Sequence, residues 1–289
     1  MEAMTVAAAL ALGAASLIAA APRRAGKAPG REEALAACRL LLEQIANFQQ
    51  HRGMSSAWLS GDAAFRERLE AKGRQIEALF PALLAMARRE AERPHPCLTG
   101  NDVELFRHRW RDLREKLPGL AVEQSIAAHS QLVECLLRWL GAFGEARLEP
   151  RVAVPGGREL VRNLAQRLPA LTECLGQARA IGTSVATRGG CPAVARVRLL
   201  FLVSRGEALL DQALGGGHGG LRQEEARRAI REMAEVVRSR MLLPAGVEVG
   251  AQAYFALATR AIDAVFAWIE DCGAVAGSVP AGRLQIRPA

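Results

Sequence analysis

Two arginines lie in stretches of small and apolar residues, which is an unusual place for a fixed positive charge. Arg52 follows Phe48 by four residues, so the two side chains share one face of a helix. Arg179 lies between Ala178 and Ile181 on a second apolar stretch. A guanidinium keeps its proton and is costly to bury alone, so an inward arginine needs an anion, a carboxylate or a route to water. The chemistry that these two positions suggest is the binding of an anion.

The composition offers a simpler interpretation of the same arginines. The chain has 289 residues and a formal net charge of +8, and only three of its 38 basic residues are lysines. In so arginine-rich a chain, an arginine at the edge of a helix commonly extends to water or pairs with a glutamate. The arginines between residues 106 and 116 alternate with acidic residues, which is typical of a solvated face. The charge therefore does not favour a nucleic-acid partner. RNA binding by the arginine-rich stretch at residues 106–116 stays open as an alternative.

No sequence pattern indicates catalysis, a metal or a cofactor. The six cysteines contain no CxxC pair, and none has a histidine at the spacing of metal ligands. The five histidines show no spacing that pairs them with a nucleophile. The glycine run at residues 215–220 lacks the Lys-Ser/Thr step of a phosphate-binding loop. The sequence predicts that the protein is not an enzyme and has no catalytic, metal-binding or cofactor-binding residues.

The elements that must position the two arginines are all helices. Apolar residues recur at spacings of three and four from residue 32 onward, and no alternating strand pattern appears. Asn101-Asp102 is expected to cap the third helix, and prolines fix the end of the second. We expect helices over about 32–60, 62–92, 101–116, 120–146, 158–167, 170–187, 191–214, 223–242 and 247–272.

The chain divides into two similar halves. Residues 150–157 hold two prolines and a Gly-Gly step, which makes them the best candidate for a linker. Short matches at offsets of 127 to 129 residues relate the stretch around Arg52 to that around Arg179, and Trp139 to Trp268. We therefore predict two related helical bundles, at about 31–149 and 158–272, followed by a tail at 273–289.

The first thirty residues differ in composition from the rest. From Ala3 to Pro22 the chain carries no charge, and Arg23, Arg24, Lys27 and Arg31 follow at once. This length suits a single membrane-spanning helix, and the basic flank places the following domain in the cytoplasm at the inner membrane. Residues 19–21, all alanine, also allow cleavage of a signal peptide and export, so both alternatives stay open.

Three motifs resemble those of the nitrate- and nitrite-sensing (NIT) domain family. They are residues 50–59 (QHRGMSSAWL), 178–182 (ARAIG) and 254–263 (YFALATRAID), in the order in which the family has them. The resemblance covers about residues 32–272. It implies an all-α fold of two packed antiparallel four-helix bundles, here preceded by the hydrophobic N-terminal helix. It also implies a bacterial signalling protein that binds nitrate or nitrite through arginines from separate helices.

The same resemblance suggests which residues bind the anion. Arg52 matches the arginine of the first motif, Arg179 that of the second-half helix and Arg260 that of the last motif. His51 stands where some members carry another charged residue, so it is included as a candidate. The expected output is a helix rearrangement that a separate effector or a second copy of the chain detects. The main alternative is a membrane-tethered helical scaffold or interaction module without a small ligand.

Overall fold

The computed structural model describes residues 30–216, 220–243 and 246–278. Within them every regular element is helical, which confirms the all-α prediction. The α-helices are α1 (Arg31–Leu59), α2 (Phe65–Ala91), α3 (Gly100–Lys116), α4 (Val122–Phe143), α5 (Gly157–Arg162), α6 (Leu168–Arg188), α7 (Ala193–Leu214), α8 (Leu221–Val236) and α9 (Ala251–Ser278). Short π-helical turns extend three of them, at Gly144–Leu148, Asn163–Arg167 and Val237–Met241.

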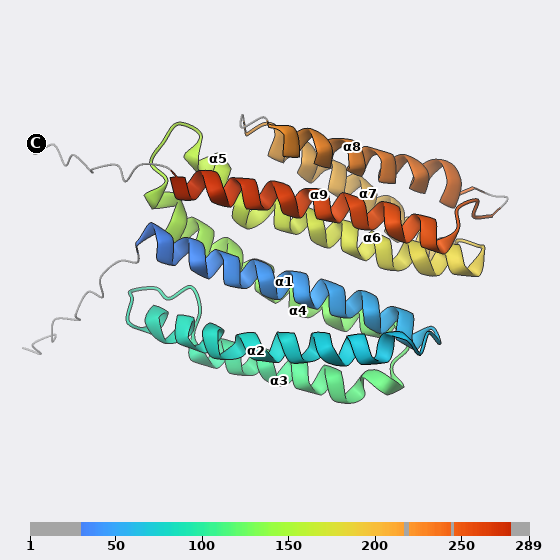
Figure 1. Cartoon of the computed structure of the whole chain (residues 1–289), viewed down its shortest axis with the longest axis horizontal. Coiled ribbons are helices and arrows are strands. Elements are labelled where there is room, and N and C mark those ends of the chain that lie inside the picture. Colours follow the sequence, from blue (N-terminus) through green and yellow to red (C-terminus); the bar gives the residue numbers. More distant parts are fainter. Residues whose placement is uncertain (1–29, 217–219, 244–245, 279–289) are drawn as a thin grey trace, which may run out of the picture.

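The long helices lie side by side along the longest axis of the molecule (Figure 1). Helices α1 and α4 pack on each other, and α1 also packs on α2, which lies beside α3; these four helices are the first helix group. Likewise α6 contacts α9 and α7, and α8 lies on α9; these four are the second helix group. Helices α1 and α4 meet α6, and α1 also touches α9, so these four form the interior of the assembly. Buried apolar residues from both groups of helices make one contiguous core.

Helix α1 is buried on more than one side because it lies between α2, α4 and the second group of helices. Leu41, Ile45 and Phe48 form the apolar stripe that the spacing predicts, and each is fully buried. The same helix also buries a set of polar side chains, namely Gln44, Asn47, Gln49, His51, Arg52 and Ser55. Buried polar groups are costly unless they are hydrogen-bonded. The hydrogen-bond partners of these side chains therefore indicate where α1 makes polar contacts with other helices.

Several predicted helix boundaries differ from the structure; the last helix, expected over about 247–272, spans Ala251–Ser278. The N-cap of α3 is Thr99, not Asn101-Asp102: the Thr99 hydroxyl accepts from the Asp102 amide, and the Asp102 carboxylate accepts from the Thr99 amide. The predicted break near residue 168 is also absent, because α5, the π-turn and α6 follow one another without interruption. Pro169 directly follows the π-turn and lies in the first turn of α6.

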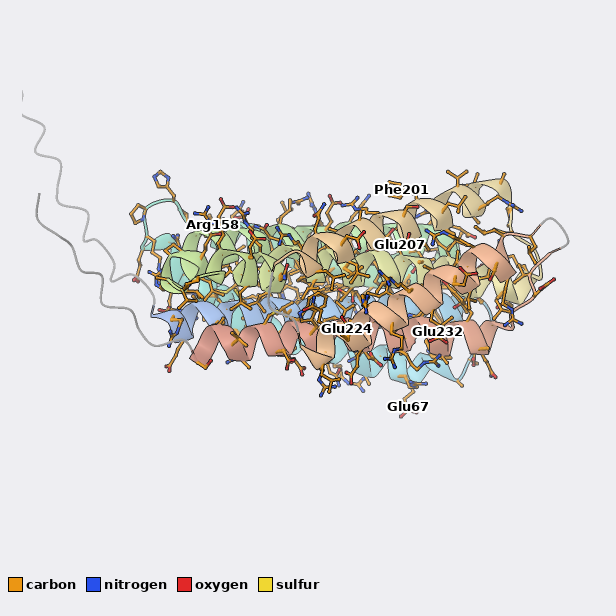
Figure 2. All side chains as sticks on the ribbon, turned by 90° about the horizontal axis from the view of Figure 1, so that it is seen from above. Glu67, Arg158, Phe201, Glu207, Glu224 and Glu232 are labelled. Carbon is orange, nitrogen blue, oxygen red and sulfur yellow. The ribbon has the colours of Figure 1, made fainter. Side chains whose placement is uncertain are left out.

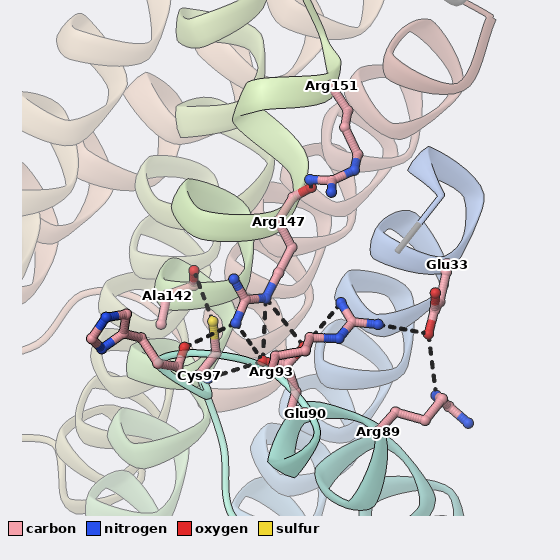
Figure 3. A network of polar contacts seen from close by, with 9 residues as sticks. Glu33, Arg89, Glu90, Arg93, Cys97, Ala142, Arg147 and Arg151 are labelled. Atoms are coloured by element: carbon pink, nitrogen blue, oxygen red, sulfur yellow. Dashed lines mark hydrogen bonds and ion pairs between the residues drawn. The ribbon is translucent and has the colours of Figure 1, made fainter. Parts of the chain in front are cut away.

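A buried carboxylate fastens one end of the first helix group (Figure 3). Glu90 of α2 is 2% exposed and accepts hydrogen bonds from the Arg147 guanidinium and from the Cys97 amide. Burial alone would raise the pKa of Glu90, but these donors, with Arg93 close by, bring it below its usual value. Arg93 also reaches Glu33 at the start of α1. The network joins α1, α2 and the turn after α4 at the end of the assembly.

The outer helices expose charged side chains, among them Glu207 on α7 and Glu224 and Glu232 on α8 (Figure 2). None of the helices in the described ranges has the length and apolar character needed to cross a membrane. The N-terminal segment for which an anchor or a signal peptide is predicted lies outside the described residues, as does most of the predicted tail. The anchor therefore stays a prediction, and so does the tail beyond Ser278, since residues 273–278 continue α9.

Candidate functional site

Arg52 is buried at the contact between α1 and α6. Its side chain is 1% exposed and forms a two-pronged ion pair with Glu173 of α6. Arg52 Nη1 donates to Glu173 Oε1 at 2.5 Å, and Nη2 donates to Oε2 at 3.1 Å. Nη1 also donates to the hydroxyl of Ser130 on α4, at 2.8 Å. The guanidinium thus obtains the carboxylate that a buried arginine requires.

The Glu173 carboxylate is also held by amide side chains. Gln49 Nε2 donates to Oε2 at 3.1 Å, and Gln177 Nε2 donates to Oε1 at 2.8 Å. A glycine makes room for the Arg52 guanidinium: a Cβ atom added at Gly176 would lie 2.7 Å from Arg52 Nη2. Both carboxylate oxygens therefore accept hydrogen bonds from side chains of α1, and one also from α6.

Arg179 of α6 reaches the contact of this helix with α1 and α9. A Cβ atom added at Gly53 of α1 would lie 3.6 Å from Arg179 Nη2, so the guanidinium sits against the α1 backbone. Nη1 donates to the Thr259 hydroxyl of α9 at 3.0 Å. The guanidinium carbon lies 5.0 Å from the centre of the Phe255 ring, a cation–π arrangement.

Arg179 differs from Arg52 in having no carboxylate at ion-pair distance within the described ranges. Its side chain is half-buried, and burial, reinforced by the positive charge of Arg52, lowers the pKa of Arg179 to about 10. Asp263 of α9 opposes this effect from the exposed side of the helix. The guanidinium remains charged at neutral pH, in a place where that charge is poorly compensated.

One further polar group near Arg179 lacks a partner. Thr183 follows Arg179 by one helical turn, and its buried hydroxyl has no hydrogen-bond partner among the described residues. The Thr183 hydroxyl can both donate and accept a hydrogen bond. A cation without a carboxylate and an unpartnered hydroxyl one turn away are groups that a small oxyanion could satisfy together.

His51 points into the first helix group instead of toward Arg179. Its Nδ1 lies 2.8 Å from Nε2 of His129 on α4, and its ring packs edge-on against Trp110. His129 Nδ1 in turn lies 2.7 Å from the Ser125 carbonyl oxygen. Burial, together with the mutual repulsion of the two rings, lowers the pKa of His51 to about 2. The pKa of His129 falls to about 4, mainly through burial. Both rings are neutral at physiological pH.

Arg260 is not brought to this contact. Its side chain is 61% exposed and lies 3.6 Å from Glu232 of α8. The neighbouring residue Thr259 does reach Arg179. One step along an α-helix turns the side chain by about 100°, which carries residue 260 away from the face that residue 259 presents. The structure therefore places Arg52 and Arg179 together and leaves His51 and Arg260 elsewhere.

A family model described as "nitrate and nitrite sensing" matches residues 44–272. The chain belongs to the NIT family. The matched region contains Arg52, Glu173, Arg179 and the α9 residues beside them. It begins partway along α1, after the residues that open the helix.

The fold of this NIT protein is also found in a solved structure, that of the NasR transcription antiterminator. The two chains superpose with a TM-score of 0.66 and share 17% sequence identity. The similarity covers 88% of this chain and 73% of the other. At this identity the likeness concerns the fold alone. No curated protein matches the chain.

Sequence reasoning missed several residues of this site in the NIT domain. Glu173, Gln49, Ser130 and Thr259 all bond directly to Arg52, to Arg179 or to their immediate partners. A partial signal for Glu173 was present: it precedes Gly176 by three residues, so these two lie near one face of α6, whereas Arg179, six residues on, is turned from Glu173 by about 120°. Ser130 and Thr259 carry no comparable signal, because their roles depend on which helices pack together.

Proposed function

We propose that this NIT protein senses nitrate or nitrite by binding the anion beside Arg179, where α1, α6 and α9 meet. The observation that carries the proposal is the half-buried Arg179 guanidinium, which has a hydroxyl and a ring as neighbours but no paired carboxylate within the described ranges. Nitrate is a flat monoanion with three acceptor oxygens, and a guanidinium can hold two of them in its own plane. The unpartnered Thr183 hydroxyl supports the same location.

Arg52 contributes to this proposed site mainly through its charge. It already holds Glu173, so its forked donors are occupied, but its charge lowers the pKa of Arg179 and so acts on the same region. An anion beside Arg179 would relieve that repulsion. Relief of repulsion favours conformations in which α1 and α6 lie closer together. We propose that a separate effector or a second copy of the chain reads this change in helix position.

One observation favours the alternative of a helical scaffold without a small ligand. The Arg52–Glu173 pair satisfies a guanidinium that is only 1% exposed, so Arg52 requires no bound anion. The two hypotheses therefore diverge on Arg179. A scaffold gains nothing from nitrate, whereas a sensor gains stability in proportion to the occupancy of the site.

Titration of the full chain with nitrate, nitrite, chloride and sulfate tests the proposal. At a nitrate concentration of about 100 Kd, binding should stabilise the protein by about 2.7 kcal/mol and raise its melting temperature by several degrees. Arg179→Gln should abolish that gain because it removes the unpaired charge. Arg260→Gln, on the exposed side of α9, is the matched control and should keep it. Equal stabilisation of the wild type and the Arg179 variant would contradict the assignment.

A further inference from the structure

We infer that Glu173 sets the net charge of the proposed anion site and thereby restricts it to anions that carry a single charge. This inference rests on the proposed function and adds a specificity residue that does not itself touch the anion. Glu173 is part of the protein's own contribution to the site, because its carboxylate pairs with Arg52 at 2.5 Å.

The Glu173 carboxylate is fixed by its surroundings. The residue is 7% exposed, and its two oxygens accept hydrogen bonds from Arg52, Gln49 and Gln177. Gly176 leaves room for the Arg52 guanidinium beside the α6 backbone. The carboxylate therefore cannot leave without exposing the buried Arg52 charge to an apolar interior. It is a charged component of the site and not an exchangeable ligand.

The charges at the contact leave room for one negative charge. Arg52 and Arg179 supply two positive charges, and Glu173 supplies one negative charge. Asp263 of α9 also acts on Arg179, but it lies at an exposed position, where water weakens the effect of its charge more than it weakens that of the buried Glu173. A bound nitrate or nitrite would balance the remaining positive charge. A dianion would leave one negative charge in excess inside the helix contact, and unbalanced buried charges are strongly disfavoured.

The decisive variant is Glu173→Gln, which keeps the shape of the side chain and removes its charge. We expect this variant to bind sulfate at least about tenfold more tightly than the wild type does. Perchlorate has the tetrahedral shape of sulfate but a single charge, so it separates charge from shape. The ratio of sulfate to perchlorate affinity, measured by calorimetry, should rise in Glu173→Gln and stay at the wild-type value in Glu173→Asp.

A surface variant controls for unspecific effects of removing a carboxylate. Glu207 of α7 (Figure 2) pairs with Arg238, and both side chains are partly exposed to solvent. Glu207→Gln removes the same charge from the whole molecule, so its sulfate-to-perchlorate ratio should equal that of the wild type. If Glu173→Gln leaves the ratio unchanged while wild-type nitrate binding still depends on Arg179, this inference is wrong and the proposed function stands. Absence of nitrate binding in the wild type would overturn both.

A second pair of variants tests the inference even if Glu173→Gln does not fold. Arg52→Gln leaves Glu173 and Arg179 with no net charge between them, so nitrate binding should weaken by at least about tenfold. The double variant Arg52→Gln/Glu173→Gln restores a net charge of +1 and should recover nitrate binding relative to Arg52→Gln. Failure of the double variant to recover binding would show that Glu173 only positions Arg52, and the inference would fall.

Discussion

Individual buried polar residues on α1 divide into two chemically different sets. Arg52 and Gln49 face α6 and bond to Glu173, whereas His51 faces α4 and bonds to His129. Adjacent residues on a helix point in directions about 100° apart, which is why residues 51 and 52 serve different contacts. Charged partners stabilise the first contact, and the second depends on rings that stay neutral.

The neutral histidine pair predicts acid sensitivity. The ordinary histidine pKa is about 6.5, and burial lowers the pKa of His51 to about 2 and that of His129 to about 4. Charges of Arg114 and Lys72 add to the effect at His51, and that of Arg52 at His129. Below pH 6.5 the unfolded chain binds protons that the folded chain does not, so stability falls as the pH falls. When the pH falls from 7 to 5, we expect each histidine to lower the free energy of unfolding by about 2 kcal/mol.

Urea unfolding at pH 7 and pH 5 measures this loss. His129→Gln removes one titrating ring and keeps a hydrogen-bonding side chain, so its stability should fall less between the two pH values than that of the wild type. His108→Gln, at an exposed position on α3, serves as the control and should behave like the wild type. If His129→Gln loses as much stability between pH 7 and pH 5 as the wild type does, the proposed role of the histidine pair is refuted.

At the scale of elements, the sequence predicts the helices well because apolar spacing is a local property. The first helix is expected over about 32–60, and α1 spans Arg31–Leu59. The errors occur where a boundary depends on side-chain geometry, as at Thr99, or on a proline that the first turn accepts, as at Pro169. The inward positions of Arg52 and Arg179 follow from helix faces. Glu173 could not be paired with Arg52 from spacing, because the two are separated by 121 residues and meet only through α1–α6 packing.

The contact between α6 and α9 depends on Gly182. A Cβ atom added there would lie 2.2 Å from the ring of Tyr254, whose hydroxyl donates to the Ala178 carbonyl oxygen at 2.9 Å. Tyr254 is fully buried and cannot turn away without disturbing the core. We expect Gly182→Ala to destabilise the protein by about 1 to 3 kcal/mol, although alanine favours helices over glycine. Thermal unfolding measures the change.

Gly141 of α4 provides the matched control for this substitution. An added Cβ atom there would lie 3.6 Å from the Gln166 side chain, an ordinary van der Waals distance. Gly141→Ala should therefore leave the stability unchanged or raise it, by up to about 1 kcal/mol. Because Arg179 lies between residues 178 and 182, Gly182→Ala should also weaken any nitrate response. Equal stability of the two variants would refute the proposed close approach of α6 and α9.

For the whole molecule, the arrangement of helices places the candidate site in the interior layers. Arg52, Glu173, Arg179 and Thr259 come from α1, α6 and α9, whereas α3 and α8 lie outside them (Figure 1). A ligand held there contacts both groups of helices at once. It can therefore alter how the groups sit against each other without rearranging either group internally, because packed helices are stiff.

Hydrogen exchange with and without nitrate tests this picture across the chain. Amides that exchange by local opening should slow near residues 49–56, 172–183 and 254–263, because a bound anion opposes separation of the helices that hold it. Locally exchanging amides of α3 and α8 should keep their rates, since those helices contribute nothing to the contact. Arg179→Gln should lose the protection at all three stretches together, because one charge links them. Protection confined to a single stretch, or equal in α3, would mean that the anion does not join the two helix groups.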